Sequence, residues 1–260
     1  MTKQIDFSTF SSIKIGPVVD VEVIDTIAAY PDVTLLGGAN NLLIAPNPPK
    51  LAMLGKNFDF IHEDESHLYI GGATMSGKIL SYAKRHDIAH FELMQKLPGT
   101  LGGMVKMNAG LKEWEIFNHL IAMRTEHGWI QKKDITYGYR KTHFEGIVFE
   151  AKFEKIKGFD TSLLAMFRQF RDNQPHLPSA GSCFKNPDHR YAGKLLDDVG
   201  LKGATVGNMA FSQSHANFLV NLGGGTYEEA ITLIEEAKRR VFEKYGIDLE
   251  LEIKILGHKI

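Results

Sequence analysis

The pattern of apolar and polar positions predicts strands and helices interspersed along the chain. Val18–Ile24 alternates as VVDVEVI, which is typical of a strand with one buried face. Several other segments share this character. The further strands that we expect are Val33–Leu36, His67–Ile70, Leu120–Thr125, Trp129–Lys132, Ile147–Glu154 and Ile247–Ile255. Leu120–Thr125 and Trp129–Lys132 flank Glu126-His127-Gly128, so these two strands should form a hairpin.

Helices are expected where the apolar period approaches 3.6 and capping residues mark an end. A short helix should cover Thr26–Tyr30 and end at Pro31, and a longer one should cover Ser76–His86. A third opens after Gly158, with Asp160 or Thr161 as its N-cap, and the final lobe should begin near this point. The last starts at the capping box Thr226-Tyr227-Glu228-Glu229 and stops at Gly246.

Composition narrows the function classes. The chain has 260 residues and a formal net charge of −1, so no overall field favours nucleic acid or an anionic membrane as a partner. The single cysteine, Cys183, cannot form an internal disulfide, which fits a cytoplasmic location. We expect no signal peptide and no membrane span, because no apolar run approaches about 18 residues. His and Cys never fall at ligand spacing, so we expect no metal site.

A glycine-rich stretch, LPGTLGGMVKMNAG, covers residues 97–110. Glycines at this density let backbone amides point the same way and approach a ligand closely. A concave row of amides binds phosphate, and no lysine or arginine lies between Leu97 and Val105. The backbone itself would then carry the recognition. A tight turn between two strands is an equally good interpretation of these residues alone.

A second candidate phosphate cradle is Gly37-Gly38-Ala39-Asn40-Asn41, which follows the expected strand Val33–Leu36 and precedes Leu42. A hairpin turn is the alternative, since Asn and Gly both tolerate positive φ. A diphosphate needs donors from more than one side, so this segment and residues 97–110 support each other.

A third segment, Gly72–Lys78, nearly matches the phosphate loop G-x-x-x-x-G-K-[ST] of nucleotide triphosphatases. Ile79 stands where Ser or Thr should hold magnesium, and we find no apolar strand ending in Asp to complete such a site. We therefore interpret this segment as a helix start and keep a P-loop NTPase as an alternative function.

The loop PSAGSCFKNP, residues 178–187, contains the hydroxyl of Ser182 beside Cys183. A nucleophilic serine would need a base and an elbow such as G-x-S-x-G, which is absent. A proton-donating serine needs no base, provided that its acceptor is as basic as a carbanion. The residues alone favour a turn serine bonded to its own backbone, and a small buried residue at Cys183.

Three more features could carry chemistry. Arg140 lies in YGYRKTHF, where its planar fork suits a carboxylate, a flavin or a sugar, although a structural ion pair is as good an interpretation. The stretch SHANFLVN places His215 and Asn217 beside an apolar run. A half-buried histidine without a functional role is the alternative interpretation. Glu252 alone would be a solvated carboxylate on a strand.

The order of these motifs resembles the UDP-N-acetylenolpyruvoylglucosamine reductases, flavoenzymes that complete UDP-N-acetylmuramate for peptidoglycan. The resemblance runs from about residue 33 to residue 257, and the pair LPGTLGG and GSCFKNP is its specific part. The matching segments are LLGGANNLLIA, LPGTLGGMVKMNAG, YGYRKTHF, PSAGSCFKNP, GLKGATVGNMAFSQSHANFLVN and LELEIKILG. The chain departs from the family at Ala39, where glycine is usual, at Asn40, where serine is usual, and at Gly207-Asn208-Met209, where a Gly-Gly pair is usual.

The resemblance implies particular site residues. Arg140, Ser182 and Glu252 stand where the family has its catalytic residues, with Ser182 as the proton donor. Non-covalent FAD would be held by Gly37, Gly38, Ala39, Asn40, Asn41, Leu42, Pro98, Gly99, Thr100, Gly102, Gly103, Asn108, Ala109, Gly110 and Arg140. The sugar nucleotide would be bound by Lys185, Asn186, Tyr191, Lys194, His215 and Asn217.

The resemblance also implies the architecture and the reaction. The fold would be α+β: a two-lobed FAD-binding module of the vanillyl-alcohol-oxidase (PCMH) type, plus a C-terminal α/β substrate-binding domain. The FAD lobes would be residues 1–55 and 56–158 and the substrate domain 159–248, with 249–260 returning to the FAD module. NADPH would reduce the enolpyruvyl sugar nucleotide through FAD, in a monomer of the shorter type that lacks an extra tyrosine-bearing loop.

Two further alternatives stay open. Another FAD oxidoreductase or oxidase of the same superfamily would use the same loops, although Gly37–Asn41 lacks the histidine that tethers flavin in many of those oxidases. A non-catalytic sugar-nucleotide binder would keep the loops without NADPH-dependent reduction.

Overall fold

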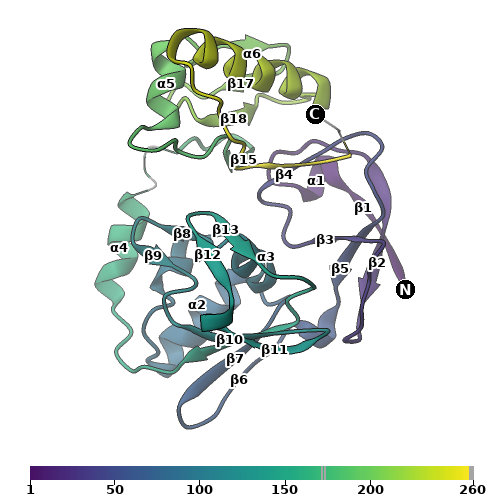
Figure 1. Ribbon diagram of the computed structural model, residues 1–260, viewed down its shortest axis with the longest axis vertical. Coiled ribbons are helices and arrows are strands. Elements are labelled where there is room, and N and C mark those ends of the chain that lie inside the picture. The colour runs from purple at the N-terminus through teal and green to yellow at the C-terminus, as the bar shows by residue number, and fades with distance from the viewer. Residues whose placement is uncertain (171, 173, 258–260) are drawn as a thin grey trace. The chain divides into compact units, whose positions relative to one another are not determined.

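The computed structural model describes residues 1–170, 172 and 174–257, and the chain separates into two compact units (Figure 1). Unit 1 consists of Met1–Lys3, Val21–Gly38 and Lys50–Asp172, and unit 2 of Gln4–Asp20, Ala39–Pro49 and Asn173–Ile260. Each unit is therefore assembled from segments that are distant in sequence. The three-part division expected from the sequence stays a prediction.

The larger sheet of unit 1 is antiparallel and has the strand order β11-β10-β14-β7-β6. Its strands are β6 (Ile61–Glu63), β7 (His67–Gly71), β10 (Leu120–Thr125), β11 (Gly128–Gln131) and β14 (Glu150–Glu154). The helical elements of this unit are η1 (Lys56–Phe58), α2 (Ser76–His86), η2 (Glu92–Lys96), α3 (Leu101–Lys106), η3 (Lys132–Asp134) and α4 (Thr161–Gln169). Helix α3 contacts β7 and β14, so the sheet supports the glycine-rich turn that precedes this helix.

A second sheet leads into the first glycine-rich segment. Its order is β1-β2-β5-β3, and β5 (Leu51–Leu54) pairs in parallel with both β2 (Val18–Ile24) and β3 (Thr34–Leu36). Strand β1 (Thr2–Asp6) lies at the far edge. The buried residues Ile24, Ala52 and Phe149 pack together beneath it. Strand β3 ends directly before Gly37, which fixes where that segment begins.

Two short hairpins complete unit 1. They are β8 (Gly110–Leu111) with β9 (Trp114–Glu115), and β12 (Thr136–Gly138) with β13 (Lys141–His143). Gly138 pairs with Lys141, so Tyr139 and Arg140 form the two-residue turn of the second hairpin. Arg140, the second residue of this turn, adopts φ +53°, in the left-handed region that favours glycine.

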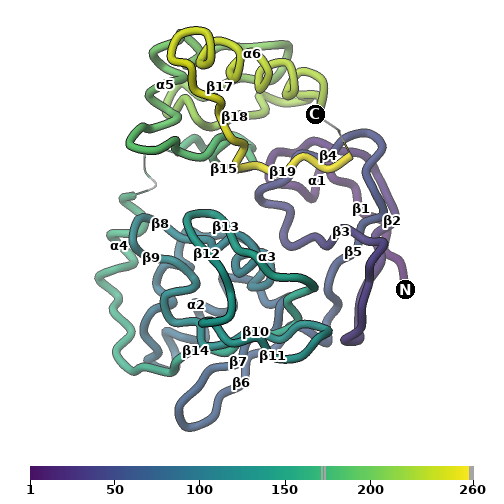
Figure 2. Tube along the Cα trace, in the orientation of Figure 1, coloured from purple at the N-terminus to yellow at the C-terminus, as the bar shows by residue number. Residues whose placement is uncertain are grey.

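Unit 2 contains an antiparallel sheet of order β15-β18-β17-β16 with two helices. The elements are β15 (Ser179–Ser182), α5 (Ala192–Asp198), β16 (Thr205–Val206), β17 (Met209–Phe211), β18 (Phe218–Asn221) and α6 (Tyr227–Tyr245). The short helix α1 (Phe7–Phe10) and the strand β4 (Leu42–Ile44) also belong to this unit. Figure 2 shows the last strand, β19 (Lys254–Leu256), running beside β4, and the two pair in parallel.

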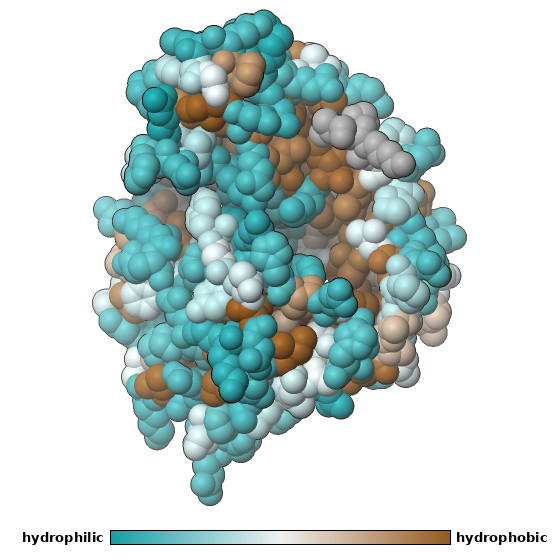
Figure 3. Space-filling model, viewed as in Figure 1, coloured by the Kyte–Doolittle hydropathy of each residue, from teal (hydrophilic) through white to brown (hydrophobic). Residues whose placement is uncertain are grey.

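Helix α6 has the caps that the sequence predicts. The Thr226 hydroxyl accepts from the Glu229 amide, the Glu229 carboxylate accepts from the Thr226 amide, and Gly246 ends the helix at φ +67°. Its buried face, which includes Ile234 and Val241, joins the core of unit 2. Figure 3 shows a mostly hydrophilic surface over this helix, where Arg239 pairs with Glu236 and Glu243.

Several predicted elements are confirmed. Strand β2 and helix α2 have the predicted bounds, and β10 and β11 form the predicted hairpin. Asp160 is the N-cap of α4, as expected, and its carboxylate accepts from the Ser162 amide. That helix, however, packs Phe167 into the core of unit 1, and unit 1 continues to Asp172.

Two predicted elements are wrong. No helix covers Thr26–Tyr30; the Thr26 and Tyr30 hydroxyls bond each other instead, at 3.0 Å. Five residues before a proline cannot repay the cost of a helical nucleus. Ile247–Ile255 is not one continuous strand, because only the segment from Lys254 pairs in a ladder with β4. Leu251 forms an isolated bridge with Phe184 instead.

None of the helices in the described ranges is long and apolar enough to cross a membrane.

The capping box of α6 gives a stability prediction. Thr226→Ala removes the acceptor for the Glu229 amide, and we expect it to lower the free energy of unfolding by about 1 kcal/mol. Thr232→Ala is the matched control, because Thr232 is exposed in the middle of the same helix and donates only to the Glu228 carbonyl. Alanine is a better helix former there, so urea unfolding should show no loss. Equal losses in both variants would contradict the role of the cap.

Candidate active site

The glycine-rich stretch 97–110 is a turn that runs into a helix, not a turn between strands. Gly99 has φ +120° and Thr100 is the N-cap residue of α3. The Gly99 carbonyl accepts from the Ser76 amide, and the Leu101 amide donates to the Thr74 carbonyl, so this turn is fixed against the start of α2. The amides of Gly99 and Thr100 donate to no acceptor in the described part of the chain.

The two glycine-rich segments meet within unit 1. A Cβ atom on Gly37 would lie 2.8 Å from the Thr100 hydroxyl and 3.6 Å from the Gly103 Cα atom. Only glycine permits so close an approach. Among the described residues, the amides of Gly37 and Gly38 also lack an acceptor. Unpaired backbone donors from two segments therefore converge where the sequence predicts a phosphate cradle.

Gly102 has a different structural role. Its amide donates to the Gly72 carbonyl at 2.9 Å, and a Cβ atom there would lie 3.1 Å from the Gly72 carbonyl and 3.2 Å from the Val148 carbonyl. The first turn of α3 therefore lies directly on the backbone of neighbouring segments. Packing alone therefore requires glycine at this position, and a contact of Gly102 with FAD stays a prediction.

Asn108 and Arg140 close the other end of the stretch. Asn108 is fully buried at φ +44°, and its side-chain Nδ2 group donates to the Glu115 carboxylate at 2.7 Å and the Gly138 carbonyl at 3.1 Å. The Arg140 guanidinium donates to the Gly110 carbonyl at 2.6 Å and lies 5.0 Å from the centre of the Tyr139 ring. The turn that carries Arg140 is thus tied to residues 108–110, and the half-buried guanidinium is held at a defined place.

The remaining part of the first cradle, residues 39–41, belongs to unit 2. Ala39 is buried and adopts φ +51°, a conformation that favours glycine. The Ser12 hydroxyl donates to the Asn40 Oδ1 atom at 2.6 Å, which leaves the Asn40 Nδ2 group as a donor. The Asn41 Nδ2 group donates to the Glu252 carbonyl at 2.9 Å. Ser12 is a contributor that sequence reasoning missed, because nothing local marks it.

Ser182 and Glu252 are brought together within unit 2 by backbone pairing. The Glu252 amide donates to the Cys183 carbonyl at 2.9 Å, and the Lys185 amide donates to the Glu250 carbonyl at 2.8 Å. Gly181, at φ +84°, turns the chain just before Ser182, at the end of β15. Ser182 therefore directly precedes the residue whose carbonyl is bonded to the Glu252 amide.

Cys183 is fully buried, as predicted. Burial raises the pKa of its thiol well above the usual range, and the charge of Glu252 acts in the same direction. Because the thiolate is the reactive form, this cysteine is an inert packing residue beside Ser182.

The residues predicted to bind the sugar nucleotide all lie in unit 2, and several are already paired. Lys185 pairs with Glu250, and Lys194 with Asp198, whose carboxylate raises the pKa of Lys194. The Asn186 side chain accepts from the Ala192 amide at 3.0 Å, and the Tyr191 side chain is 74% exposed. Their contacts with a substrate stay predictions.

His215 and Asn217 precede β18, whose first residue, Phe218, pairs with Ser182. Burial lowers the pKa of His215, and its Nδ1 atom accepts from the Asn217 amide at 3.3 Å, which requires the neutral ring. Asn217 is buried, and both polar atoms of its side chain bond the backbone of Phe184.

Gly72–Lys78 is a helix start, as interpreted. Lys78 donates to the Asp59 carboxylate at 2.8 Å. The amides of Gly72, Ala73, Thr74 and Ser76 donate to backbone carbonyls. A phosphate loop needs a free lysine and free amides, so this segment cannot cradle a phosphate in the described conformation.

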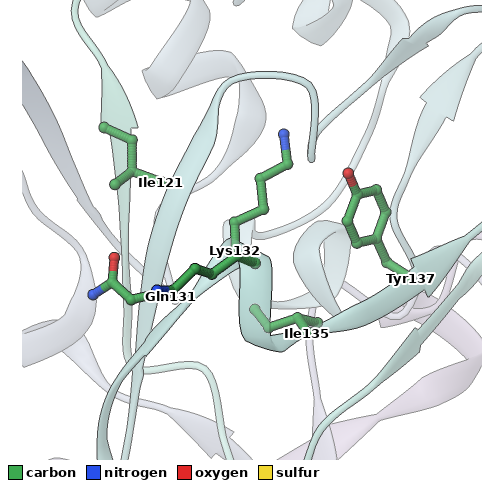
Figure 4. Close-up of a pocket in the computed structure, with 6 residues that line it drawn as sticks. Ile121, Gln131, Lys132, Ile135 and Tyr137 are labelled. Atoms are coloured by element: carbon green, nitrogen blue, oxygen red, sulfur yellow. The ribbon is translucent and has the colours of Figure 1, made fainter.

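A surface pocket in unit 1 contains none of the predicted site residues. It is lined by Ile121, Gln131, Lys132, Lys133, Ile135 and Tyr137. Figure 4 shows Lys132 and Tyr137 extending side by side from η3 and β12, and Lys132 donates to the Asn118 carbonyl at 3.1 Å. In the residues that the structure describes, no group of three His, Cys, Asp or Glu side chains could hold a metal ion.

Comparison with known proteins identifies the fold. A crystal structure of UDP-N-acetylenolpyruvylglucosamine reductase from Thermus caldophilus matches with a TM-score of 0.85 and 27% identity, covering 98% of this chain and 99% of that one. The family model for the C-terminal domain of UDP-N-acetylenolpyruvoylglucosamine reductase matches residues 173–256.

Curated relatives match over almost the whole chain. The UDP-N-acetylenolpyruvoylglucosamine reductase of Helicobacter hepaticus is 47% identical over 98% of this chain and 99% of its own length. The enzyme of the same name from Helicobacter pylori strain 26695 is 47% identical over 97% and 98%, and that of Campylobacter jejuni strain RM1221 is 44% identical over 97% and 99%.

These matches first define a class: the chain is an oxidoreductase with an α+β fold, in which a PCMH-type FAD-binding module is joined to a C-terminal domain. The predicted fold class is thereby confirmed. Within that class, the chain belongs to the UDP-N-acetylenolpyruvoylglucosamine reductase family, as its motifs suggested.

The conformation of Ala39 gives a second prediction. Glycine at position 39 relieves a strain of about 1 kcal/mol, which offsets the loss of a buried methyl group and the greater freedom of the unfolded chain. We expect Ala39→Gly to leave the free energy of unfolding within about 0.5 kcal/mol. Ala52→Gly, in the regular strand β5 and fully buried, should cost about 1 kcal/mol or more. Equal losses in urea unfolding would show that Ala39 is unstrained.

Proposed function

We propose that this chain catalyses the NADPH-dependent reduction of UDP-N-acetylglucosamine enolpyruvate to UDP-N-acetylmuramate through bound FAD. The observation that carries the proposal is the pairing of Cys183 with Glu252, since it holds a hydroxyl donor and a carboxyl group on adjoining segments. The relatives that share 44 to 47% of this sequence are named as reductases of this substrate.

The residues present fit a dinucleotide. Gly37 lies so close to Thr100 and Gly103 that a Cβ atom would clash, and the amides of this turn lack acceptors in the described residues. A diphosphate supplies acceptors for such donors. Within unit 1, Gly37, Gly38, Gly99 and Thr100 would supply these donors. FAD, when bound, supplies the transfer of a hydride from NADPH to the substrate.

Arg140 and Glu252 would stabilise the substrate as charge develops. Addition of hydride to the terminal carbon of the enolpyruvyl group puts negative charge on the adjacent carbon and its carboxylate. Preorganised charge at that carboxylate is the most effective form of catalysis. The Arg140 guanidinium is already fixed by the Gly110 carbonyl, so little reorganisation is needed, and a protonated Glu252 would add a second donor.

Ser182 would complete the reaction by giving its hydroxyl proton to the adjacent carbon. The carbanion is basic enough to take a proton from an unactivated hydroxyl, and the serine oxygen then recovers a proton from solvent. No general base is required, which agrees with a serine that lacks a nucleophile elbow. We further propose that the chain acts in peptidoglycan precursor synthesis, as a monomer in the cytoplasm.

The glycine contact predicts the effect of a substitution on cofactor affinity. Gly37→Ala adds a methyl group 2.8 Å from the Thr100 hydroxyl, which displaces the turn that should receive the diphosphate. We expect FAD affinity to fall by about tenfold or more, which corresponds to about 1.4 kcal/mol. Titration of the apoprotein, followed by flavin fluorescence, measures this loss.

Gly77→Ala is the control for that substitution. A Cβ atom on Gly77 would meet nothing within 4 Å, and the residue lies in α2. FAD should bind this variant with unchanged affinity. If Gly37→Ala also bound FAD normally, the dinucleotide could not lie against Gly37.

The proton donor gives a prediction for the two half-reactions. Ser182→Ala should leave the reduction of FAD by NADPH unchanged. Reoxidation of the flavin by UDP-N-acetylglucosamine enolpyruvate should slow by about a hundred- to ten-thousandfold, the usual contribution of general acid catalysis. Stopped-flow absorbance near 450 nm follows both steps. Equal rates in Ser182→Ala and the unsubstituted protein would remove Ser182 from the mechanism.

A further inference from the structure

The side chain of Asn217 makes hydrogen bonds to the backbone of the kind that a neighbouring strand would make. Beyond the pairing of Ser182 with Phe218, the ladder between β15 and β18 ends. The Asn217 side chain continues it: Oδ1 accepts from the Phe184 amide at 3.0 Å, and Nδ2 donates to the Phe184 carbonyl at 2.8 Å. The Asn217 carbonyl also accepts from the Cys183 amide at 2.7 Å. One buried residue thus satisfies three backbone groups of residues 183–184.

The opposite edge of the same segment is bonded to the chain around Glu252. The Cys183 carbonyl accepts from the Glu252 amide, and the Lys185 amide donates to the Glu250 carbonyl. Residues 183–185 therefore lie between Asn217 on one side and residues 250–252 on the other. Any shift of this segment changes the position of Ser182 relative to Glu252.

We propose that Asn217 is a positioning residue for Ser182: its side chain holds residues 183–184 in place, so that the serine hydroxyl and Glu252 keep their relative position. This inference rests on the proposed function. It also assigns to Asn217 a role that needs no contact with the sugar nucleotide, because both polar atoms of its side chain already bond Phe184. The side chain acts through the backbone alone.

Strand β18 offers a matched comparison. Asn221 is its last residue and is 3% exposed, as is Asn217, which directly precedes the strand. Its Nδ2 group donates to the Ile13 carbonyl at 3.0 Å, and its Oδ1 atom accepts from the amides of Gly223 and Gly225, both at 2.9 Å. Truncation of either asparagine leaves buried backbone groups unpaired, so both should lower stability to a similar degree. Only Asn217 bonds the segment that follows Ser182.

The experiment compares Asn217→Ala, Asn217→Asp, Asn221→Ala and Ser182→Ala, each loaded with FAD and studied below its unfolding temperature. Asn217→Asp keeps an acceptor for the Phe184 amide but sets an oxygen against the Phe184 carbonyl, so it tests the bond without emptying the site. Stopped-flow absorbance gives the rates of flavin reduction by NADPH and of reoxidation by UDP-N-acetylglucosamine enolpyruvate. Titration of the oxidised enzyme with the same substrate gives Kd.

We expect both Asn217 variants to reoxidise about ten- to a hundredfold more slowly at saturating substrate, because a displacement near 1 Å costs about that much. Flavin reduction and substrate Kd should stay within about twofold, and Asn221→Ala should match the unsubstituted protein in both half-reactions. A merely structural role for Asn217 would lower stability without separating the two rates.

Three results would overturn the inference. Reoxidation could be equally slow in Asn221→Ala, or unchanged in both Asn217 variants. A raised Kd with a normal rate at saturation would make Asn217 a substrate contact. If Ser182→Ala itself left reoxidation unchanged, the proposed function would fail, and that result is distinct because it does not involve Asn217.

Discussion

The hydrogen bond from the Glu252 amide to the Cys183 carbonyl is the constraint on which the site in unit 2 depends. It joins two segments that are about seventy residues apart in the chain. Because the bond is between backbone atoms, it requires no side chain. The side chains of Ser182 and Glu252 take no part in this backbone contact. A buried thiol between them, whose pKa is raised by burial, cannot compete as a nucleophile.

The glycine-rich segments of unit 1 are also held together by the backbone, here through close approach rather than a hydrogen bond. Gly37 approaches Thr100 and Gly103 so closely that any Cβ atom would enter the space. The backbone amides there lack acceptors in the described residues, and such donors need water or a ligand as a partner. The anionic ligand that we propose would supply these acceptors. Gly102, by contrast, packs against carbonyl groups, so glycine density alone does not tell a binding residue from a packing residue.

Much of the fold could be predicted from local pattern. Strand β2, helix α2 and the capped helix α6 have signals that lie within their own residues, and the structure keeps them. The predicted helix at Thr26–Tyr30 and the predicted strand at Ile247–Ile255 were wrong because contacts outside the local pattern decide both conformations. A side-chain hydrogen bond replaces the helix, and an isolated bridge to Phe184 interrupts the strand. The order of the motifs predicted the candidate site residues. It could not predict the hydrogen bonds that Ser12 and Asn217 make, because their partners, Asn40 and Phe184, are distant in sequence.

A buried asparagine is costly unless all of its polar atoms are bonded, and this cost explains why such a residue specifies one conformation. The donor and the acceptor of the Asn217 side chain are fixed relative to each other. Both hydrogen bonds therefore form only when the Phe184 backbone occupies one position. A hydrophobic contact at the same position would tolerate sliding. Directional bonding therefore suits the segment after Ser182, because the hydroxyl that we propose as the proton donor needs a defined position.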